Sequence, residues 1–247
     1  MEPPLSRPVP VPSIIHENDD FLVVDKPAFL LSHPTRPDGQ PSLITWLREQ
    51  RPGDYLTLLH RLDRETSGLV LVAKNAATTN VLSRLIERRA IEKEYEAVCW
   101  GAMAAEELVI EARLGSVGLS ETNAVYIKQG VRPDGAEALT RVWKIAGGGG
   151  FTHVRAQPRT GRLHQIRVHL SLVNLPVVGD KIYGPDANHF LQFIETGWTP
   201  ALEKELLLPR HALHAACLRF LWQGKPFEVR APLPDDLKGF LARSLRG

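Results

Sequence analysis

One carboxylate between two arginines is the arrangement in this chain best suited to chemistry. Asp63 lies between Arg61 and Arg64 in the segment 60–68, which reads His-Arg-Leu-Asp-Arg-Glu-Thr-Ser-Gly. Neighbouring guanidiniums favour the ionised form of a carboxylate even where water is partly excluded. An ionised and positioned Asp can act as a nucleophile or transfer a proton. The ordinary alternative is an Arg–Asp pair that only holds a turn in place.

Two apolar runs must position this segment. Residues 55–59 precede it and residues 69–72 follow it, and both runs are predicted to be buried strands. Asp63 is therefore expected in a short, rigid connection at the edge of a sheet.

A second charged residue lies on an apolar helical face. If residues 163–173 form a helix, Arg167 shares one face with three apolar residues, Leu163, Ile166 and Leu170. A guanidinium on such a face is costly to bury unless an anion pairs with it. Spacing alone leaves three outcomes open for Arg167: a pair with Asp63, a pair with Asp180, or exposure to solvent.

The remaining pattern predicts an α+β protein with a mixed, mostly antiparallel sheet. Strands are predicted at 21–24, 95–100, 151–157, 213–221 and 226–230, with short β-like runs over 108–145 and a hairpin link at 147–150. Helices are predicted over 43–48 after Ser42, over 76–89 after Asn75, and from Asp235. The second of these helices has an apolar face of Val81, Leu82, Leu85 and Ile86. Residues 184–210 are predicted to be an irregular insertion with short helices.

Composition limits the class of protein. A chain of 247 residues with 43% hydrophobic content can bury a full core, and its net charge of +2 is compatible with a nucleic-acid partner. Cys99 and Cys217 lie in apolar surroundings, which predicts buried free thiols. The sequence has neither a membrane-length apolar run nor a signal-peptide pattern, so a cytoplasmic protein without a membrane partner is expected. Residues 1–13 are rich in Pro and are predicted to form an extended arm.

The segment 60–68 resembles the signature of the RluA-like family of RNA pseudouridine synthases. Five further segments match that family in order, and together they extend the resemblance over roughly residues 14–232. They are 23–27 (Val-Val-Asp-Lys-Pro), 92–97 (Glu-Lys-Glu-Tyr-Glu-Ala), 160–170 (Thr-Gly-Arg-Leu-His-Gln-Ile-Arg-Val-His-Leu), 178–184 (Val-Gly-Asp-Lys-Ile-Tyr-Gly) and 213–215 (Leu-His-Ala).

The resemblance implies a fold and a set of roles. It implies a central mixed sheet in two halves with flanking helices and a central active-site cleft, in one catalytic domain over 14–247 without a separate N-terminal RNA-binding module. It implies catalysis by Asp63, with Arg167 as its ion-pair partner and Tyr95 stacked on the target uracil. Arg61 would fill the space that a flipped base leaves, and Ile166 would form the opposite wall.

Further residues are candidates for contacts with RNA. Lys26, Arg162 and His60 are expected at the substrate, and other basic residues are plausible phosphate contacts: Arg88, Arg89, Lys93 and Arg159. Each alone is more often a solvated surface charge. As a set they would make binding depend on salt.

The implied reaction is the isomerisation of uridine to pseudouridine in ribosomal or transfer RNA. Nothing enters or leaves overall, so no cofactor is expected. The sequence does not separate attack of Asp63 on the ribose anomeric carbon from removal of a ribose proton. Which uridine is modified, whether several are, and the role of the insertion also stay open, as does the oligomeric state, with a monomer favoured.

Two other interpretations compete with an RNA isomerase. His164 with His169, and His211 with His214, suggest metal ligands, but neither pair is flanked by the Cys or Glu of usual zinc sites, so no metal is predicted. The other alternative is a non-catalytic RNA-binding or RNA-remodelling protein on the same fold. That protein would not need Asp63, Tyr95 and Arg167 together, and this chain has all three.

Overall fold

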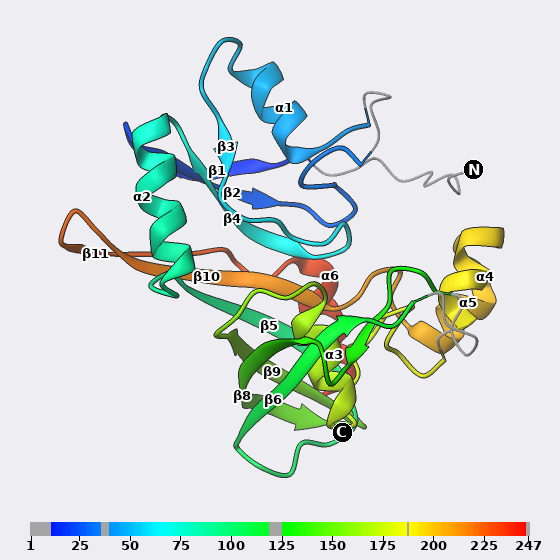
Figure 1. Ribbon diagram of the computed structural model, residues 1–247. Coiled ribbons are helices and arrows are strands. Elements are labelled where there is room, and N and C mark those ends of the chain that lie inside the picture. Colours follow the sequence, from blue (N-terminus) through cyan, green and yellow to red (C-terminus); the bar gives the residue numbers. More distant parts are fainter. Residues whose placement is uncertain (1–10, 36–39, 119–124, 187, 246–247) are drawn as a thin grey trace. The chain divides into compact units, whose positions relative to one another are not determined.

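The chain forms two compact units, shown in the computed structural model of Figure 1. The structure describes residues 11–35, 40–118, 125–186 and 188–245. We name each unit by the residue predicted to act in it: the Asp63 unit contains Val9–Glu94 and His214–Leu233, and the Arg167 unit contains Tyr95–Leu213 and Pro234–Gly247. Most of the predicted N-terminal arm lies outside the described residues, and the single domain over 14–247 stays a prediction.

The Asp63 unit is built on a mixed sheet. Its strands follow the order β1 (Ser13–Glu17), β2 (Phe21–Lys26), β4 (Ser67–Ala73) and β10 (Leu213–Trp222), with β3 (Thr57–Leu58) paired to β4 and β11 (Lys225–Arg230) paired to β10. The pairing of β4 with β10 is parallel, and the other pairings named here are antiparallel. The described part of this unit also contains two helices, α1 (Leu43–Gln50) and α2 (Ala76–Glu87).

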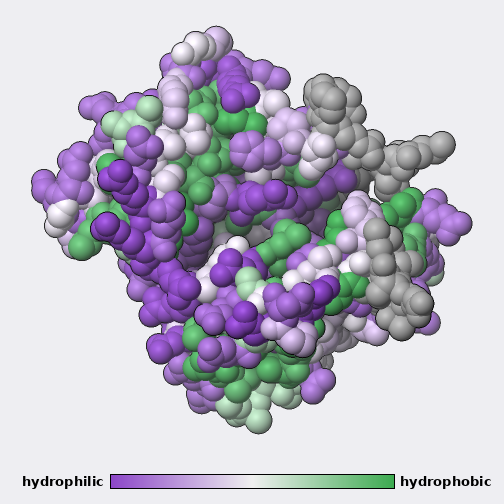
Figure 2. Space-filling view, viewed as in Figure 1, coloured by the Kyte–Doolittle hydropathy of each residue, from purple (hydrophilic) through white to green (hydrophobic). Residues whose placement is uncertain are grey.

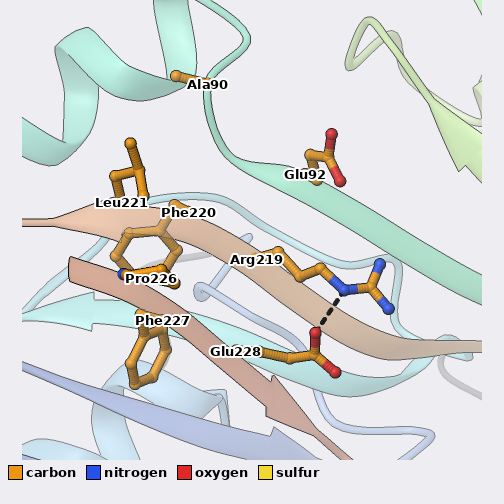
Figure 3. A pocket seen from close by; sticks show the side chains of 8 residues that line it. All are labelled: Ala90, Glu92, Arg219, Phe220, Leu221, Pro226, Phe227 and Glu228. Carbon is orange, nitrogen blue, oxygen red and sulfur yellow. Dashed lines mark hydrogen bonds and ion pairs between the residues drawn. The ribbon is translucent and has the colours of Figure 1, made fainter. Parts of the chain in front are cut away.

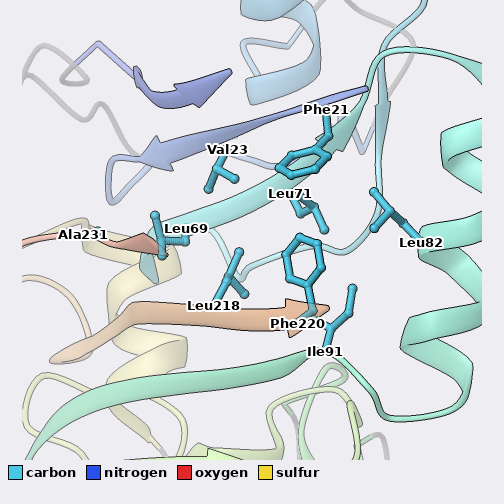
Figure 4. Packing of buried hydrophobic residues seen from close by; sticks show 9 residues of the cluster. All are labelled: Phe21, Val23, Leu69, Leu71, Leu82, Ile91, Leu218, Phe220 and Ala231. Carbon is cyan, nitrogen blue, oxygen red and sulfur yellow. The ribbon is translucent and has the colours of Figure 1, made fainter. Parts of the chain in front are cut away.

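The core of this unit explains why its central strands read as unbroken apolar runs. Alternate residues of β2 and β4 point to one side, where they pack against α2 and β10 in a cluster of Phe21, Val23, Leu69, Leu71, Leu82, Ile91, Leu218, Phe220 and Ala231 (Figure 4). The intervening residues of both strands are buried as well, so each strand is covered on both faces.

Both predicted helix caps are confirmed. The Ser42 hydroxyl accepts from the Thr45 N–H at 3.3 Å and the Thr45 hydroxyl accepts from the Ser42 N–H at 2.9 Å, which closes a capping box on α1. The side-chain oxygen of Asn75, Oδ1, accepts from the Thr78 N–H at 2.7 Å at the start of α2. The apolar face predicted for α2 is wrong at Val81, which is exposed.

The first apolar run before Asp63 is only partly a strand. β3 covers two residues, Thr57 and Leu58, and Tyr55 is exposed. Its ring reaches outward, where the Tyr55 and Thr79 hydroxyls lie 3.3 Å apart. The strand predicted over 55–59 was therefore too long, because Tyr55 lies before the strand and only Thr57 and Leu58 belong to it.

In its described residues, the Arg167 unit contains an antiparallel sheet and four helices. Its strands follow the order β5 (Glu92–Trp100), β9 (Phe151–Pro158), β8 (Ala136–Gly148), β6 (Glu107–Ser116) and β7 (Gln129–Val131). The predicted hairpin link lies between β8 and β9, where Gly149 and Gly150 have positive φ. The helices are α3 (Gln165–Leu172), α4 (Asn188–Thr196), α5 (Pro200–Leu206) and α6 (Asp235–Ser244). The predicted α+β class with a mixed, mostly antiparallel sheet is confirmed.

Two further features of the sequence have their expected outcome. Cys99 and Cys217 are free and buried, and burial raises the pKa of the Cys99 thiol. In the part of the chain that the structure describes, no helix has the length and apolarity needed to cross a bilayer. On the face shown in Figure 2, hydrophilic residues predominate and hydrophobic ones are interspersed among them.

Candidate active site

Asp63 lies in the connection between β3 and β4, half-buried, one residue before a tight turn. The Asp63 carbonyl accepts from the Thr66 N–H at 3.1 Å, which closes that turn through Arg64 and Glu65. The predicted connection between two strands is thus present, although β4, into which it leads, pairs with β2, β3 and β10 and is not an edge strand.

The residue before Asp63 is clamped by a buried hydroxyl. Ser32 donates to the Leu62 carbonyl at 2.9 Å and accepts from the Leu62 N–H at 3.0 Å. One hydroxyl therefore satisfies both backbone groups of Leu62, as its single donor and two lone pairs allow. This fixes the peptide plane that leads directly into Asp63.

The residue after Asp63 is held by a buried lysine. Lys26 has no exposed surface, and its ammonium donates to the carbonyls of Pro27 at 2.9 Å, Leu30 at 2.8 Å and Arg64 at 3.4 Å. The Arg64 side chain donates in turn to the Phe29 carbonyl at 3.3 Å. Lys26 was expected to contact RNA phosphate; the structure instead encloses it, as a cation that organises three carbonyls.

His60 holds the start of the same segment. Its Nε2 accepts from the Leu71 N–H at 3.2 Å, so this nitrogen carries no proton. Burial and the nearby Lys93 charge hold the pKa of His60 well below its usual range. His60 was expected to contact RNA, and in the structure its ring accepts a hydrogen bond from the backbone of β4.

The end of the segment is fixed by close approach of two strands. The Ser67 hydroxyl lies 2.9 Å from Nδ1 of His214, and Gly68 pairs with Ala215. Gly68 has a φ of +112°, and a Cβ there would lie 2.3 Å from the Ala215 carbonyl oxygen. Only glycine permits both this backbone conformation and this approach. Asp63 therefore lies in a segment held at both ends and on both sides.

Arg167 lies on α3, in the Arg167 unit, and its side chain is 5% exposed. Its Nε and Nη2 donate to the two carboxylate oxygens of Asp180 at 2.6 and 2.8 Å. The guanidinium also lies over the Tyr183 ring, 5.0 Å from its centroid. Of the alternatives weighed from spacing, the pair with Asp180 is present; the pair with Asp63 stays a prediction.

Asp180 is fully buried and remains ionised. Burial alone would raise the pKa of its carboxyl group, but the Arg167 charge and hydrogen bonds, the nearby His211 and the Ile182 N–H together hold it well below its usual range. The carboxylate accepts from the backbone N–H groups of Ile182 at 3.0 Å and Tyr183 at 3.1 Å.

A buried amide fixes the first turn of α3. The Gln165 side chain accepts from the Thr160 hydroxyl at 2.7 Å and the Arg162 N–H at 3.0 Å, and donates to the Leu139 carbonyl and the Thr140 hydroxyl at 3.0 Å each. His164 precedes the helix with a φ of 55°. Because the helix begins at Gln165, Leu163 lies before it and is exposed, contrary to the predicted apolar face.

The other predicted site residues divide by exposure. Tyr95 on β5 and Ile166 on α3 are buried, and their contact with the uracil stays a prediction. Arg61, Arg162, Arg88 and Arg89 are exposed, and Arg162 donates to the Glu137 carbonyl at 3.0 Å. Lys93 is half-buried, and burial lowers its pKa to about 8.

Comparison with known proteins decides the family. The profile of the family described as RNA pseudouridylate synthase matches residues 20–172, which is more than half of the chain and includes both Asp63 and Arg167. The chain belongs to this family.

Relatives support the RluA-like branch of the pseudouridine synthases. The ribosomal large subunit pseudouridine synthase D of Vibrio parahaemolyticus is 34% identical over 233 residues, covering 91% of this chain and 68% of the relative. An uncharacterized RNA pseudouridine synthase of Bacillus subtilis is 32% identical over 239 residues, covering 94% and 76%. The resemblance expected from the motifs is confirmed.

Solved structures agree on the fold. Human RNA pseudouridylate synthase domain containing 1 superposes with a TM-score of 0.71 at 28% identity, covering 96% of this chain and 89% of the human chain. Human RNA pseudouridylate synthase domain containing 4 has a TM-score of 0.72 at 23% identity, which shows a shared fold.

Sequence reasoning missed the residues that hold the site of this synthase. Ser32 and Gln165 fix the backbone beside Asp63 and the start of α3, yet a lone serine and a lone glutamine give no signal in a pattern. Tyr183 stood in a motif, at residues 178–184, without an assigned role. The signal that could have pointed to Tyr183 is its place in that motif, three residues after Asp180.

Histidines suspected of metal binding have other contacts. Nδ1 of His164 lies 2.8 Å from the Tyr183 hydroxyl, and Nδ1 of His169 lies 2.9 Å from the Thr140 hydroxyl. No group of three or more His, Cys, Asp or Glu suited to a metal is found among the residues that the structure describes.

A pocket on the Asp63 unit is separate from the predicted site. It has a volume of about 300 Å³, and an ion pair of Arg219 with Glu228 at 2.7 Å lies at its wall (Figure 3). Its lining residues include none of those predicted to act on RNA: Ala90, Glu92, Arg219, Phe220, Leu221, Pro226, Phe227 and Glu228. We assign it no part in catalysis.

Proposed function

We propose that this synthase converts uridine to pseudouridine in structured RNA, with Asp63 as the catalytic residue. Family membership supports the reaction, and the fixed backbone around Asp63 supports the residue. A carboxylate on such a backbone need not be ordered when the substrate binds, so the cost of bringing it to the reacting atom is already met in folding.

The base must leave its stack before Asp63 can reach the sugar. Extraction costs a few kcal/mol, and a planar guanidinium can offset it by stacking in the vacated space. Arg61 is exposed and stands two residues before Asp63, so it suits this role. The exposed Arg162, Arg88 and Arg89 would contact phosphates.

Two routes are open for the chemical step. In one, an Asp63 oxygen bonds to the ribose anomeric carbon as the bond to the uracil nitrogen breaks, and the electron pair leaves with the uracil. In the other, Asp63 removes a proton from the ribose carbon next to the anomeric one as the bond to the uracil nitrogen breaks, and the electron pair again leaves with the uracil. In both, the uracil rotates and its fifth carbon bonds to the anomeric carbon. In the first route this breaks the bond between Asp63 and the ribose and frees the carboxylate, and in the second Asp63 returns the proton to the ribose carbon. The proton on the fifth carbon is then lost, and the freed uracil nitrogen takes up a proton.

Three residues of the Arg167 unit would complete the site. Arg167 would pair with Asp63 and keep it ionised, Tyr95 would stack on the uracil, and Ile166 would form the opposite wall. Because reactant and product are isomers, the reaction needs no redox or group-transfer cofactor.

Ribosomal RNA of the large subunit is the substrate to test first. Relatives at 31–34% identity are named ribosomal large subunit pseudouridine synthase D. Transfer RNA is the second candidate. A protein with such substrates would act in the cytoplasm.

The test measures loss of the proton from the fifth carbon. RNA labelled with tritium at uracil carbon five releases tritium to water on isomerisation. We expect Asp63→Asn to release less than one thousandth of the wild-type amount per unit time while its Kd for RNA stays within about threefold. Asp54→Asn, an exposed change in the same unit, should match the wild type.

The outcome that would contradict the proposal is turnover by Asp63→Asn near the wild-type rate. Absence of tritium release from every RNA by the wild type, with binding intact, would instead support a non-catalytic RNA-binding protein. Mapping pseudouridines in cellular RNA with and without the protein would then identify the modified uridine.

A further inference from the structure

Asp180 and Tyr183 together hold the guanidinium of Arg167 in one orientation. Its two oxygens take Nε and Nη2 of Arg167 at 2.6 and 2.8 Å, so the planar group is fixed in the plane of the carboxylate. The same carboxylate accepts from two backbone N–H groups, Ile182 and Tyr183, so it cannot turn without losing them. Tyr183 also places its ring beneath the guanidinium.

The tyrosine is itself fixed at its far end. The Tyr183 hydroxyl accepts from the Gln129 N–H at 2.8 Å and lies 2.8 Å from Nδ1 of His164. His164 immediately precedes α3, the helix that carries Arg167. Arg167, Asp180, Tyr183 and His164 therefore form a closed network that begins and ends at one helix terminus.

The turn that carries Asp180 is packed too tightly to shift. A Cβ at Gly179 would lie 2.0 Å from the Arg210 carbonyl oxygen, and one at Gly184 would lie 2.2 Å from the Asp180 carbonyl oxygen. Lys181 is buried, donates to the Pro209 carbonyl at 2.7 Å and lies 4.7 Å from the centre of the Phe193 ring. The insertion at 184–210 thus braces the turn from its other side.

We propose that Asp180 is a positioning residue that orients Arg167 for its partner in catalysis. Arg167 binds Asp180 through Nε and Nη2. A second carboxylate would therefore bind Arg167 through its remaining terminal nitrogen, Nη1. A buried Arg–carboxylate pair adds little net stability compared with apolar residues of the same size, so stability alone does not account for it. This inference rests on the proposed function, in which that second carboxylate is Asp63.

The test compares two bidentate Arg–Asp pairs of the same unit. Asp180→Asn and Asp180→Glu change the first, and Asp236→Asn is the control with the same hydrogen-bond geometry, because Asp236 takes Nε and Nη2 of the buried Arg210 at 2.7 and 3.0 Å. The Asp236 side chain is 43% exposed and that of Asp180 is fully buried, so each rate is corrected for the folded fraction of its variant. Asp180→Glu keeps the charge and changes only its reach. Single-turnover tritium release, RNA affinity and folded fraction are measured for each variant across pH.

We expect both Asp180 variants to slow the single-turnover rate at least about 100-fold with RNA affinity within threefold, whereas Asp236→Asn stays within about threefold of wild type. A misoriented Arg167 favours ionised Asp63 less, so the acid limb of the pH–rate profile should move up by about one pH unit. A purely structural role would lower the folded fraction and leave that limb unmoved.

Three results would overturn the inference. The Asp180 variants could match Asp236→Asn in single-turnover rate and in the acid limb, or their loss of rate could be accounted for by their lower folded fraction. The third such result is failure of both Asp180 variants to fold. Failure of the proposed function is distinguishable from these. If the proposed function is wrong, Asp63→Asn keeps turnover near the wild-type rate, and this result does not depend on the rates of the Asp180 variants.

Discussion

Gly68 offers the sharpest test of how the Asp63 segment is held. Gly68→Ala places a Cβ 2.3 Å from the Ala215 carbonyl oxygen and 2.6 Å from the Ala215 nitrogen, at a φ of +112°. The obstructing atoms are backbone, so no side chain can rotate away. Either β4 and β10 move apart by roughly 1 Å, or their parallel pairing breaks.

The expected cost has two parts. A non-glycine residue held at this backbone conformation costs on the order of 1–3 kcal/mol. Overpacking against fixed atoms adds roughly another 1–3 kcal/mol. We therefore expect Gly68→Ala to lower the free energy of unfolding by about 4 kcal/mol, a large part of the stability of an ordinary domain.

The control separates the two parts. Gly53 has a φ of +87° and nothing within 4 Å of a built Cβ, so Gly53→Ala carries the conformational cost without the collision. That change should cost about 1 kcal/mol, because alanine also restricts the unfolded chain. Urea unfolding followed by circular dichroism gives both values, provided that the slope with urea is unchanged.

The two variants should also differ in activity. Gly68 is five residues after Asp63, so a shift of β4 moves the turn that carries it, and single-turnover tritium release should fall more than tenfold even for the folded fraction. Gly53→Ala should retain wild-type activity. If Gly68→Ala unfolds within about 1 kcal/mol of Gly53→Ala, the reasoning about close approach is wrong.

Two further predictions concern buried charge. Lys26→Met should lower the free energy of unfolding by about 2–4 kcal/mol, because the backbone carbonyls that accept from the Lys26 ammonium would lose their donor. The control in urea unfolding is Lys238→Met, a change at an exposed lysine. Equal unfolding midpoints for the two variants would contradict the prediction. Burial lowers the pKa of His169 to about 4, so below pH 6.5 the unfolded chain binds the proton first and stability falls as pH drops toward 4. We expect a slope of up to about 1.4 kcal/mol per pH unit from this residue. His169→Gln should remove that share of the slope, and an unchanged slope in urea unfolding between pH 6.5 and 4 would refute it.

Much of the local structure follows from residues close together in sequence. The caps at Ser42 and Asn75 depend on hydrogen bonds that span three residues, so the helices they begin could be located from sequence. Strands β2 and β4 read as apolar runs because both of their faces are covered. Boundaries were less certain where a run was short, as at β3 and at the start of α3.

The predicted site residues differ in how far sequence could place them. Asp63 was placed in its connection because the flanking strands are local. The enclosure of Lys26 was not foreseen, since its three acceptors are brought together by the fold and a lysine in a motif looks the same whether it contacts phosphate or carbonyls. Ser32 acts on Leu62 across 30 residues, and no periodicity carries that information.

Sequence by itself determined the family, the central strands and the capped helices, and the acidic residue between two arginines, because each is encoded in residue types at fixed short spacings. Only the tertiary structure decided that Arg167 meets Asp180, that Lys26 is enclosed, and that Gly68 lies against Ala215. Those contacts depend on segments far apart in the chain, and their partners become known only when the sheet is assembled.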